Sequence, residues 1–388
     1  MNIHFLLTKD FFRGGGIETY TREVGRRLVE RGHKVTVYST RGNDICPNEW
    51  EGMRFVWLPR VTPYWAEKTC GGVFAAMRAL LEDSPDVFHL HSVVAGSLSP
   101  ILRLKGIPCV LQMHGIEWQR TRWGLAAKTV LKAMERASLL AADAVTAVSK
   151  TQCEYLKTHY AAHCEFIPTA ADIKDYASPK LISEMGLRFR EYVLFAARLV
   201  PEKGAHHLIR AYRRVMTDRP LIIAGEAPAG GAYGEQLRKL AGGDSRIRFI
   251  GRVQGRLLEE LFSNAALFVQ PSELEGLSIG LIEAMSYGIQ CLSSDISENR
   301  EVVGDAALMF RNKDVDDLER QLIAALSNGK AESGFAAAAR ERVESLFSWK
   351  RVVDQLEALY ERVVFGLEKQ DASRTVPQSA SQPGTLVT

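Results

Sequence analysis

The sequence predicts an α/β protein of two domains, each built on a parallel sheet that helices cover. Its 388 residues, 46% of them apolar, are enough for about two hydrophobic cores of ordinary size. Apolar runs of strand length alternate with longer segments of helical period along the chain, which is typical of parallel sheets with helices on their faces. A polar stretch after Pro168 interrupts this alternation, and the same pattern then starts again. The restart predicts a second sheet.

The first half of the chain predicts an acceptor-side domain over residues 1–170. Helices fit between its apolar runs, as in the segment 17–31, where Ile17, Tyr20, Val24 and Leu28 share one face and arginines fall largely on the other. The expected strands are 3–7, 35–39, 54–58, 87–91, 109–113, 144–148 and 165–168.

The polar stretch from Asp172 to Pro179 predicts a linker into a second domain over residues 171–348. Its expected strands are 192–196, 221–224, 246–250, 267–270, 290–293 and 307–310. A last helix over 349–367 is expected to pack back on the first domain. The tail 370–388 is rich in Ser, Thr, Gln and Pro and lacks apolar periodicity, so it is predicted to be disordered.

Composition excludes several classes of function. No stretch approaches the roughly 18 apolar residues that cross a bilayer, and residues 1–7 are typical of a buried strand and not of a signal peptide. The 6 cysteines have no zinc-site spacing and indicate reduced, structural thiols in a cytoplasmic protein. Residues 1–170 hold 21 Lys and Arg against 16 Asp and Glu, an excess too small to indicate nucleic acid as a partner.

Three consecutive glycines, Gly14 to Gly16, follow the first strand and lead directly into a helix. Backbone without Cβ atoms can approach a ligand closely there, and the free N–H groups of a helix start favour an anion. The motif is neither Gly-x-Gly-x-x-Gly nor a triphosphate-binding loop. Taken alone, it fits a tight turn as well as it fits a phosphate site.

Two glutamates, Glu275 and Glu283, follow the expected strand 267–270. Glu275 lies in the loop before a helix that should start near Ser278, and the first N–H groups of that helix can hold a diphosphate. Glu283 lies about one and a half turns inside the helix, where it can accept hydrogen bonds from the vicinal hydroxyls of a ribose. The alternative is a Ser278 cap with two solvated glutamates, which explains one glutamate better than the whole array.

Together these features resemble the retaining glycosyltransferases of family 4, whose GT-B architecture has two Rossmann-like domains facing each other across a cleft. The resemblance covers nearly the whole chain, and its hallmark is the pair of glutamates with seven residues between them, met by Glu275 and Glu283. It implies that Glu275 contacts the donor sugar and Glu283 the donor ribose. A second marker, met by Arg198 and Lys203, implies that both bind the donor pyrophosphate, where fixed cations stabilise the charge that grows on the leaving phosphate.

The resemblance extends to a histidine at a strand end. A lone histidine in such a place is more often structural than catalytic, but the family carries one there that reaches the donor sugar, which implies this role for His114. The implied catalytic set is His114, Arg198, Lys203 and Glu275. The implied donor-binding set is Gly15, Gly16, Arg252, Val253, Gly276, Leu277, Ser278, Ile279 and Glu283.

Neither a metal nor another cofactor is expected, because Arg198, Lys203 and the helix N-terminus already supply positive charge. The Asp-x-Asp sequence that starts at Asp314 predicts the start of a helix instead, since acidic residues stabilise a first helical turn.

The segment His114-Gly-x-Glu-Trp118 looks like the bacterial subgroup that includes rhamnosyltransferases of surface-polysaccharide assembly. This implies transfer of a hexosyl or deoxyhexosyl residue from a nucleotide-diphosphate sugar to a glycan or polyprenyl-diphosphate-linked acceptor. The products would be capsule, O-antigen or exopolysaccharide, made in the cytoplasm or at the inner face of the plasma membrane. A group of basic and aromatic residues starts at the end of this segment: Trp118, Trp123, Arg120, Arg122, Lys128, Lys132 and Arg136. They can form a surface that binds lipid phosphates, or they can be an ordinary solvated helix face.

One segment departs from the family, because residues 168–172 read Pro-Thr-Ala-Ala-Asp where many members have Pro-Asn-Gly. No site residue is expected there. Two other functions remain open: a nucleotide-sugar epimerase of the same architecture, and a non-catalytic subunit that binds nucleotide sugars. If the family mechanism applies, the anomeric configuration is retained without an enzymic nucleophile, and an oxygen of the leaving diphosphate helps to deprotonate the acceptor.

Overall fold

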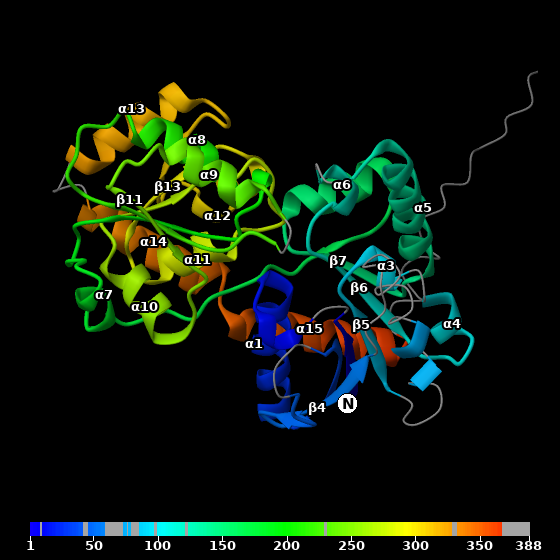
Figure 1. Cartoon of the computed structure of the whole chain (residues 1–388). Coiled ribbons are helices and arrows are strands. Elements are labelled where there is room, and N and C mark those ends of the chain that lie inside the picture. The colour runs from blue at the N-terminus through cyan, green and yellow to red at the C-terminus, as the bar shows by residue number, and fades with distance from the viewer. Residues whose placement is uncertain are drawn as a thin grey trace, which may run out of the picture.

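The computed structural model describes residues 1–7, 10–41, 46–58, 73–75, 77–78, 85–96, 99–120, 123–228, 231–327 and 332–366. Over these ranges the chain forms two α/β domains, each built around its own sheet with helices on both faces (Figure 1). The predicted fold class is therefore confirmed. The predicted tail 370–388 lies outside the described residues.

The N-terminal domain contains a sheet with the strand order β3-β4-β2-β1-β5-β6-β7-β8. All seven predicted strands form within two residues of their expected ends, because strands buried on both faces give long apolar runs. The strands are β1 Asn2–Leu6, β2 Lys34–Thr40, β3 Glu49–Trp50, β4 Met53–Leu58, β5 Val87–Leu90, β6 Cys109–Met113, β7 Ala144–Ala147 and β8 Glu165–Phe166. Its helices are η1 Phe11–Arg13, α1 Gly16–Glu30, α3 Val93–Gly96, α4 Ser99–Arg103, η2 Glu117–Gln119, α5 Leu125–Ala141 and α6 Lys150–Tyr160.

The C-terminal domain contains a parallel sheet with the strand order β11-β10-β9-β12-β13-β14. The strands are β9 Val193–Ala196, β10 Leu221–Ala224, β11 Ile247–Gly251, β12 Leu267–Gln270, β13 Gln290–Ser294 and β14 Leu308–Phe310. The helices are α7 Leu181–Glu184, η3 Pro201–Lys203, α8 Ala205–Tyr212, α9 Tyr233–Ala241, α10 Gly255–Asn264, α11 Ile279–Ser286, α12 Ser297–Val303, α13 Val315–Ser327 and α14 Glu332–Leu346. Asp314 accepts a hydrogen bond from the N–H of Asp317 (2.9 Å) and so caps α13, as its sequence predicts.

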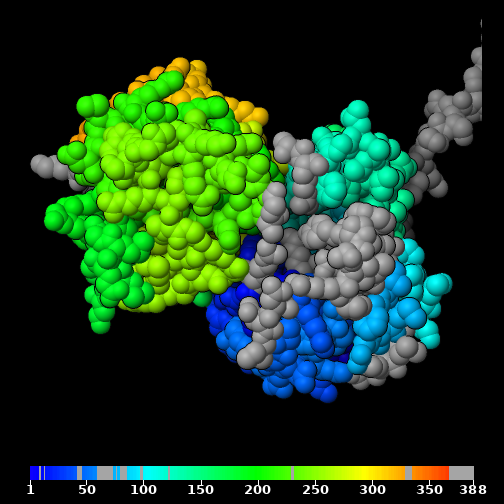
Figure 2. Space-filling view, in the orientation of Figure 1, coloured from blue at the N-terminus to red at the C-terminus, as the bar shows by residue number. Residues whose placement is uncertain are grey.

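The last helix, α15 Trp349–Val364, returns to the N-terminal domain and lies beside α1 (Figure 1). Its apolar face joins the core that contains Phe5, Tyr20 and Val24, and the Tyr360 hydroxyl lies 2.6 Å from Nδ1 of His89. The chain thus passes between the domains twice, near Ala171 and near Phe347, and the N–H of Ala171 donates to the carbonyl of Phe347 (3.0 Å). Figure 2 shows the two domains as separate lobes.

Among the described helices, none is both long and apolar enough to span a bilayer.

Candidate active site

Both sheets reverse their strand order at a position from which site residues project. In the second sheet, β10 lies on one side of β9 and β12 on the other, and in the first sheet β2 and β5 flank β1 in the same way. Ligands of open parallel sheets bind beyond the carboxyl ends of the strands at such reversals. The loops after β1, β9 and β12 contain the glycine loop, Lys203 and Glu275, as the sequence predicts.

Glu275 and Lys203 form a buried ion pair at the carboxyl ends of β12 and β9. The Nζ of Lys203 lies 2.5 Å and 2.7 Å from the two carboxylate oxygens, and Glu275 is only 8% exposed. Oε1 of Glu275 also accepts hydrogen bonds from Gln270 Nε2 (2.9 Å) and Ser272 Oγ (2.7 Å). A buried carboxylate with three donors is held in one orientation, so its direction is fixed before any ligand arrives.

Gly204 brings these two loops together. It has a φ of +70°, and a Cβ atom there would lie 1.8 Å from the carbonyl oxygen of Pro271. The N–H of Glu273 also donates to the carbonyl of Glu202 (2.8 Å). Glycine at this position therefore lets the loop with Lys203 lie directly on the loop with Glu275.

Helix α11 starts beside Glu275 and presents its N-terminus to the same space. Ser278 is its N-cap, and the hydroxyl accepts from the N–H of Leu281 (3.4 Å). The side chain of Leu277 packs into the C-terminal core, so only its backbone faces a ligand. Ser278 therefore caps α11, as the alternative to a ligand site predicted. The cap does not use the N–H groups of Gly276 to Ile279, which remain at the start of the helix.

The glycine loop of the N-terminal domain faces this helix mouth from the other lobe. A Cβ atom on Gly14 would meet Gln254 at 2.7 Å and Arg252 at 3.1 Å, and one on Gly16 would meet Ile279 at 3.4 Å. The Glu18 carboxylate occupies the space over Gly15, 2.5 Å from where a Cβ would lie. The predicted residues Gly15, Gly16, Arg252 and Ile279 are therefore brought together, whereas the Val253 side chain packs on the C-terminal core.

The two domains approach each other closely at His114 and Gly276. A Cβ atom on Gly276 would lie 2.1 Å from the carbonyl oxygen of His114, and Gln152 Nε2 donates to the carbonyl of Gly276 (3.0 Å). Farther out, both oxygens of Glu301 accept from the N–H of Lys150 at 2.9 Å. His114 thus lies next to the loop that contains Glu275.

Replacing Gly276 by alanine is expected to lower kcat/KM roughly ten- to a hundredfold, because the new methyl group would push the two domains apart at the site. Gly334→Ala is the matched control, since nothing lies within 4 Å of a Cβ there. The measurement is steady-state sugar transfer together with the melting temperature. Equal rates for both variants would show that the close approach at Gly276 is not needed for turnover.

A short hydrogen-bond chain orients the His114 ring. Thr21 Oγ1 donates to the carbonyl of Ile17 (2.9 Å) and lies 3.1 Å from Nε2 of His91, so it accepts the Nε2 proton of His91. Burial lowers the pKa of His91 well below its usual range, so this ring is neutral and its Nδ1 has no proton. Nδ1 of His91 then accepts from Nε2–H of His114, 3.0 Å away. Thr21 and His91 therefore fix both the tautomer and the plane of His114.

Glu283 lies in α11, where burial raises the pKa of its carboxyl to about 7. Lys174 lowers this pKa and Glu23 of α1 raises it, but both effects are smaller than burial. The carboxyl makes no hydrogen bond to a described residue. It is therefore a desolvated acceptor whose protonation changes near neutral pH.

Arg198, in contrast, is exposed after β9 and pairs with no carboxylate among the described residues, which leaves its guanidinium accessible to an anion. Four residues that the sequence did not predict hold His114 and Glu275 in place: Thr21, His91, Gln270 and Ser272. His91 and Ser272 follow the ends of β5 and β12 by one and two residues, and polar residues near the ends of buried strands are candidates for a site.

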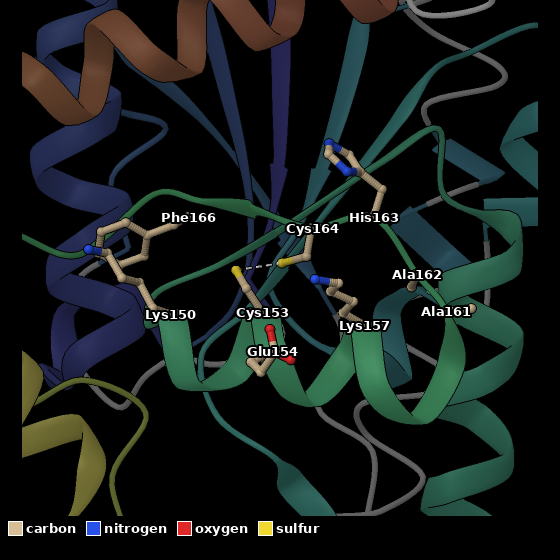
Figure 3. Close-up of a pocket in the computed structure, with 9 residues that line it drawn as sticks. All are labelled: Lys150, Cys153, Glu154, Lys157, Ala161, Ala162, His163, Cys164 and Phe166. Carbon is tan, nitrogen blue, oxygen red and sulfur yellow. Dashed lines mark hydrogen bonds between the residues drawn. The ribbon is translucent and has the colours of Figure 1, made fainter. Parts of the chain in front are cut away.

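A separate pocket lies between α6 and β8, and none of the predicted site residues lines it (Figure 3). Its walls include Cys153 and Cys164, whose Sγ atoms are 2.9 Å apart. Lys150, at the edge of this pocket, places its Nζ 5.6 Å from the centre of the Phe166 ring. The pocket is therefore lined by residues of the N-terminal domain that are distinct from the residues predicted for the site around Glu275.

Two family models match the chain, one for each domain. The model described as Glycosyltransferase Family 4 matches residues 14–175, and the one described as Glycosyl transferases group 1 matches residues 188–342. The first spans the glycine loop and His114, and the second spans Arg198, Lys203 and both glutamates. The chain belongs to the GT-B glycosyltransferases.

Two relatives of this glycosyltransferase match it over most of their lengths. An alpha-maltose-1-phosphate synthase of Mycolicibacterium smegmatis is 28% identical over 346 residues, which cover 79% of this chain and 89% of the relative. A phosphatidyl-myo-inositol mannosyltransferase of the same organism is 26% identical over 386 residues, 94% of each chain. The Anabaena protein HepE, solved in complex with UDP-glucose, has the same fold with a TM-score of 0.77 and 17% identity over 93% of this chain and 99% of its own.

Proposed function

We propose that this glycosyltransferase moves a hexosyl or deoxyhexosyl residue from a nucleotide-diphosphate sugar to an acceptor hydroxyl, with retention of anomeric configuration. The observation that carries the proposal is the meeting of the Lys203–Glu275 pair with His114 across Gly276. A fixed cation, a fixed carboxylate and an oriented imidazole surround one space between two domains. Such a space suits a reaction in which charge separates between a sugar and its leaving diphosphate.

In this proposal the diphosphate lies between Lys203, Arg198 and the N-terminus of α11. These groups stabilise the negative charge that grows as the glycosidic bond to phosphate breaks. Glu283 accepts the ribose hydroxyls, and Gly15, Gly16 and Arg252 border the nucleotide from the opposite side. The protein positions the acceptor hydroxyl on the face of the leaving group, whose oxygen takes the proton, and neither metal nor cofactor enters the scheme. The UDP-glucose complex of HepE, a protein of the same fold, supports a donor of this class.

The test has two stages. A thermal-shift screen with UDP, GDP and dTDP identifies the base, because a ligand that binds only the folded state raises the melting temperature. Release of nucleoside diphosphate from the matching donor sugars, with and without lipid-linked acceptors, then measures transfer, and proton NMR of the product reads its anomeric configuration. A donor sugar altered without any acceptor would indicate an epimerase. Binding without turnover over the whole panel would indicate a non-catalytic subunit.

For the acceptor, we propose a glycan or polyprenyl-diphosphate-linked oligosaccharide of bacterial surface-polysaccharide assembly, at the cytoplasmic side of the plasma membrane. The support is the His114-to-Trp118 segment, which resembles the rhamnosyltransferase-like subgroup. The similarity to a phosphatidyl-myo-inositol mannosyltransferase, whose name specifies a lipid acceptor, agrees with an acceptor in the membrane.

The outward face of α5 supports contact with that membrane. Leu125, Val130 and Leu140 are 87%, 58% and 73% exposed, and the exposed Lys132 and Arg136 lie on the same helix. Nζ of Lys132 lies 4.0 Å from the centre of the Trp118 ring. Large apolar side chains beside cations are what an interfacial helix presents to anionic lipid. Arg122, predicted for the same surface, lies outside the described residues.

Removing the two cations, as Lys132→Gln with Arg136→Gln, is expected to weaken binding to anionic vesicles roughly thirtyfold, since each cation near such a surface contributes about 1 kcal/mol. Sedimentation with phosphatidylglycerol vesicles measures the effect. Arg188→Gln with Lys350→Gln is the charge-matched control, because these side chains are 81% and 82% exposed on other elements. Equal binding by both double variants would show that the α5 face is an ordinary solvated surface.

A further inference from the structure

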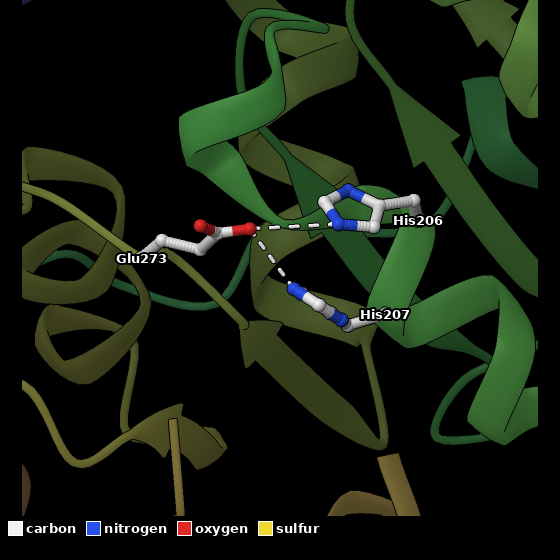
Figure 4. A group of neighbouring side chains, drawn as sticks. All are labelled: His206, His207 and Glu273. Atoms are coloured by element: carbon white, nitrogen blue, oxygen red, sulfur yellow. Dashed lines mark hydrogen bonds and ion pairs between the residues drawn. The ribbon is translucent and has the colours of Figure 1, made fainter. Parts of the chain in front are cut away.

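Two histidines and a glutamate meet where the chain segments that contain Lys203 and Glu275 lie together. His206 and His207 occupy the first turn of α8, and Glu273 lies in the loop after β12 (Figure 4). Oε1 of Glu273 lies 2.9 Å from Nε2 of His207 and 3.5 Å from Nε2 of His206. One nitrogen or oxygen from each residue lies within 4.8 Å of the other two.

These separations suit a metal ion. Zinc bonds to imidazole nitrogen and carboxylate oxygen are about 2.0–2.2 Å long, which places neighbouring ligands of a tetrahedral site roughly 3.3 Å apart. The two measured distances to Oε1 lie on either side of that value. Small side-chain rotations would therefore bring all three atoms around one cation.

The surroundings leave the cluster incompletely satisfied without a cation. Nδ1 of His206 lies 2.7 Å from the Tyr233 hydroxyl, a partner that can hold the ring proton on Nδ1 and leave Nε2 as a lone pair. That lone pair would then face a carboxylate oxygen. Nδ1 of His207 is buried and has no hydrogen-bond partner among the described residues. A cation between the three groups would separate the Nε2 lone pair of His206 from the carboxylate oxygen of Glu273. A water molecule or a small shift would give Nδ1 of His207 a hydrogen-bond partner.

Lys313 limits the affinity of this cluster for a cation. Its Nζ lies 2.9 Å from Oε2 of Glu273, so the carboxylate shares its charge between an ammonium on one oxygen and the histidines on the other. A second cation bound at Oε1 is repelled by this ammonium at short range. Because the Lys313 side chain is 59% exposed, the ammonium can also move away.

We propose that His206, His207 and Glu273 bind a divalent transition-metal ion, zinc or an ion of similar preference, which joins α8 to the loop that contains Glu275. The two imidazole ligands favour such ions over magnesium or calcium, which prefer oxygen ligands. The ion would be structural, because all three ligands belong to the C-terminal domain and none is among the residues predicted to contact the donor. The proposal is independent of the proposed function, since binding is measured without any sugar donor.

The test titrates the full chain, with its affinity tag removed, with zinc against a chromogenic chelator, and with cobalt(II) followed by absorption. One ion per chain is expected, with a cobalt spectrum free of the thiolate charge-transfer band that Cys153 and Cys164 would give. His207→Gln and Glu273→Gln should each weaken binding at least about tenfold, and Tyr233→Phe by less. Lys313→Gln should tighten it several-fold, an effect that a loss of folding cannot imitate. Unchanged affinity in His207→Gln, a thiolate band, or no binding at all would overturn the proposal.

Discussion

Replacing Glu275 by glutamine is expected to lower kcat/KM for sugar transfer by roughly two to three orders of magnitude. Glutamine has the same shape, but it carries no charge to hold Lys203, and its amide would place N–H groups against that ammonium or against Gln270. In the proposed mechanism the carboxylate also lies where positive charge develops on the sugar ring as the diphosphate leaves. Steady-state release of nucleoside diphosphate in the presence of acceptor measures the loss.

Loss of structure must be separated from loss of charge in this variant, because removing one partner of a buried ion pair leaves the other charge uncompensated. The melting temperature and the affinity for the nucleoside diphosphate monitor the fold. Glu259→Gln is the matched control, since that side chain is 41% exposed in α10 and pairs with the partly exposed Lys174 and the exposed Arg256. A folded Glu275→Gln protein within threefold of the control rate would exclude the carboxylate from the chemistry.

The strands could be predicted because most are buried on both faces. Cys109–Met113, Leu221–Ala224 and Leu267–Gln270 have the expected ends, since a run of apolar residues starts and stops where the sheet does. The strand Glu49–Trp50 was missed. It has two residues and pairs antiparallel with Met53 and Arg54, which leaves no periodicity to detect.

The candidate site was only partly predictable for a different reason. Lys203 and Glu275 could be assigned from motifs on two loops, but their 2.5 Å contact depends on the close approach that Gly204 permits. That approach also brings His207 to Glu273, 66 residues away, and no local pattern indicates this pair. Thr21 lies in α1, His91 follows β5 and His114 follows β6, so the role of Thr21 and His91 appears only when the order of the strands is known.

Donor affinity is expected to fall about tenfold between pH 8 and pH 6, because in the proposed complex the ribose hydroxyls bind the ionised form of Glu283. Burial raises the pKa of this carboxyl to about 7 in the unliganded protein, so it is largely ionised at pH 8 and largely protonated at pH 6. A protonated carboxyl offers one acceptor fewer to the ribose. Calorimetric titration with a nucleotide sugar measures the effect cleanly, since its diphosphate diester does not titrate in this range. Donor affinity should no longer depend on pH in Glu283→Gln. A pH dependence that persists in this variant would assign the titration to another group.

The Glu283→Gln substitution should raise the free energy of unfolding, whereas it removes a group proposed to bind the donor. Because the folded pKa of Glu283 is raised above 4.5, the folded state binds more protons than the unfolded state between the two values, and stability falls as pH rises through this window. Glutamine carries no such cost. The free energy of unfolding of Glu283→Gln should therefore exceed that of the natural chain at pH 8 by at most about 3 kcal/mol, and this difference should shrink toward pH 5. A group that is desolvated only to bind ribose should show this trade between stability and affinity. A glutamine variant that is less stable at pH 8 would mean that the carboxylate instead stabilises the fold.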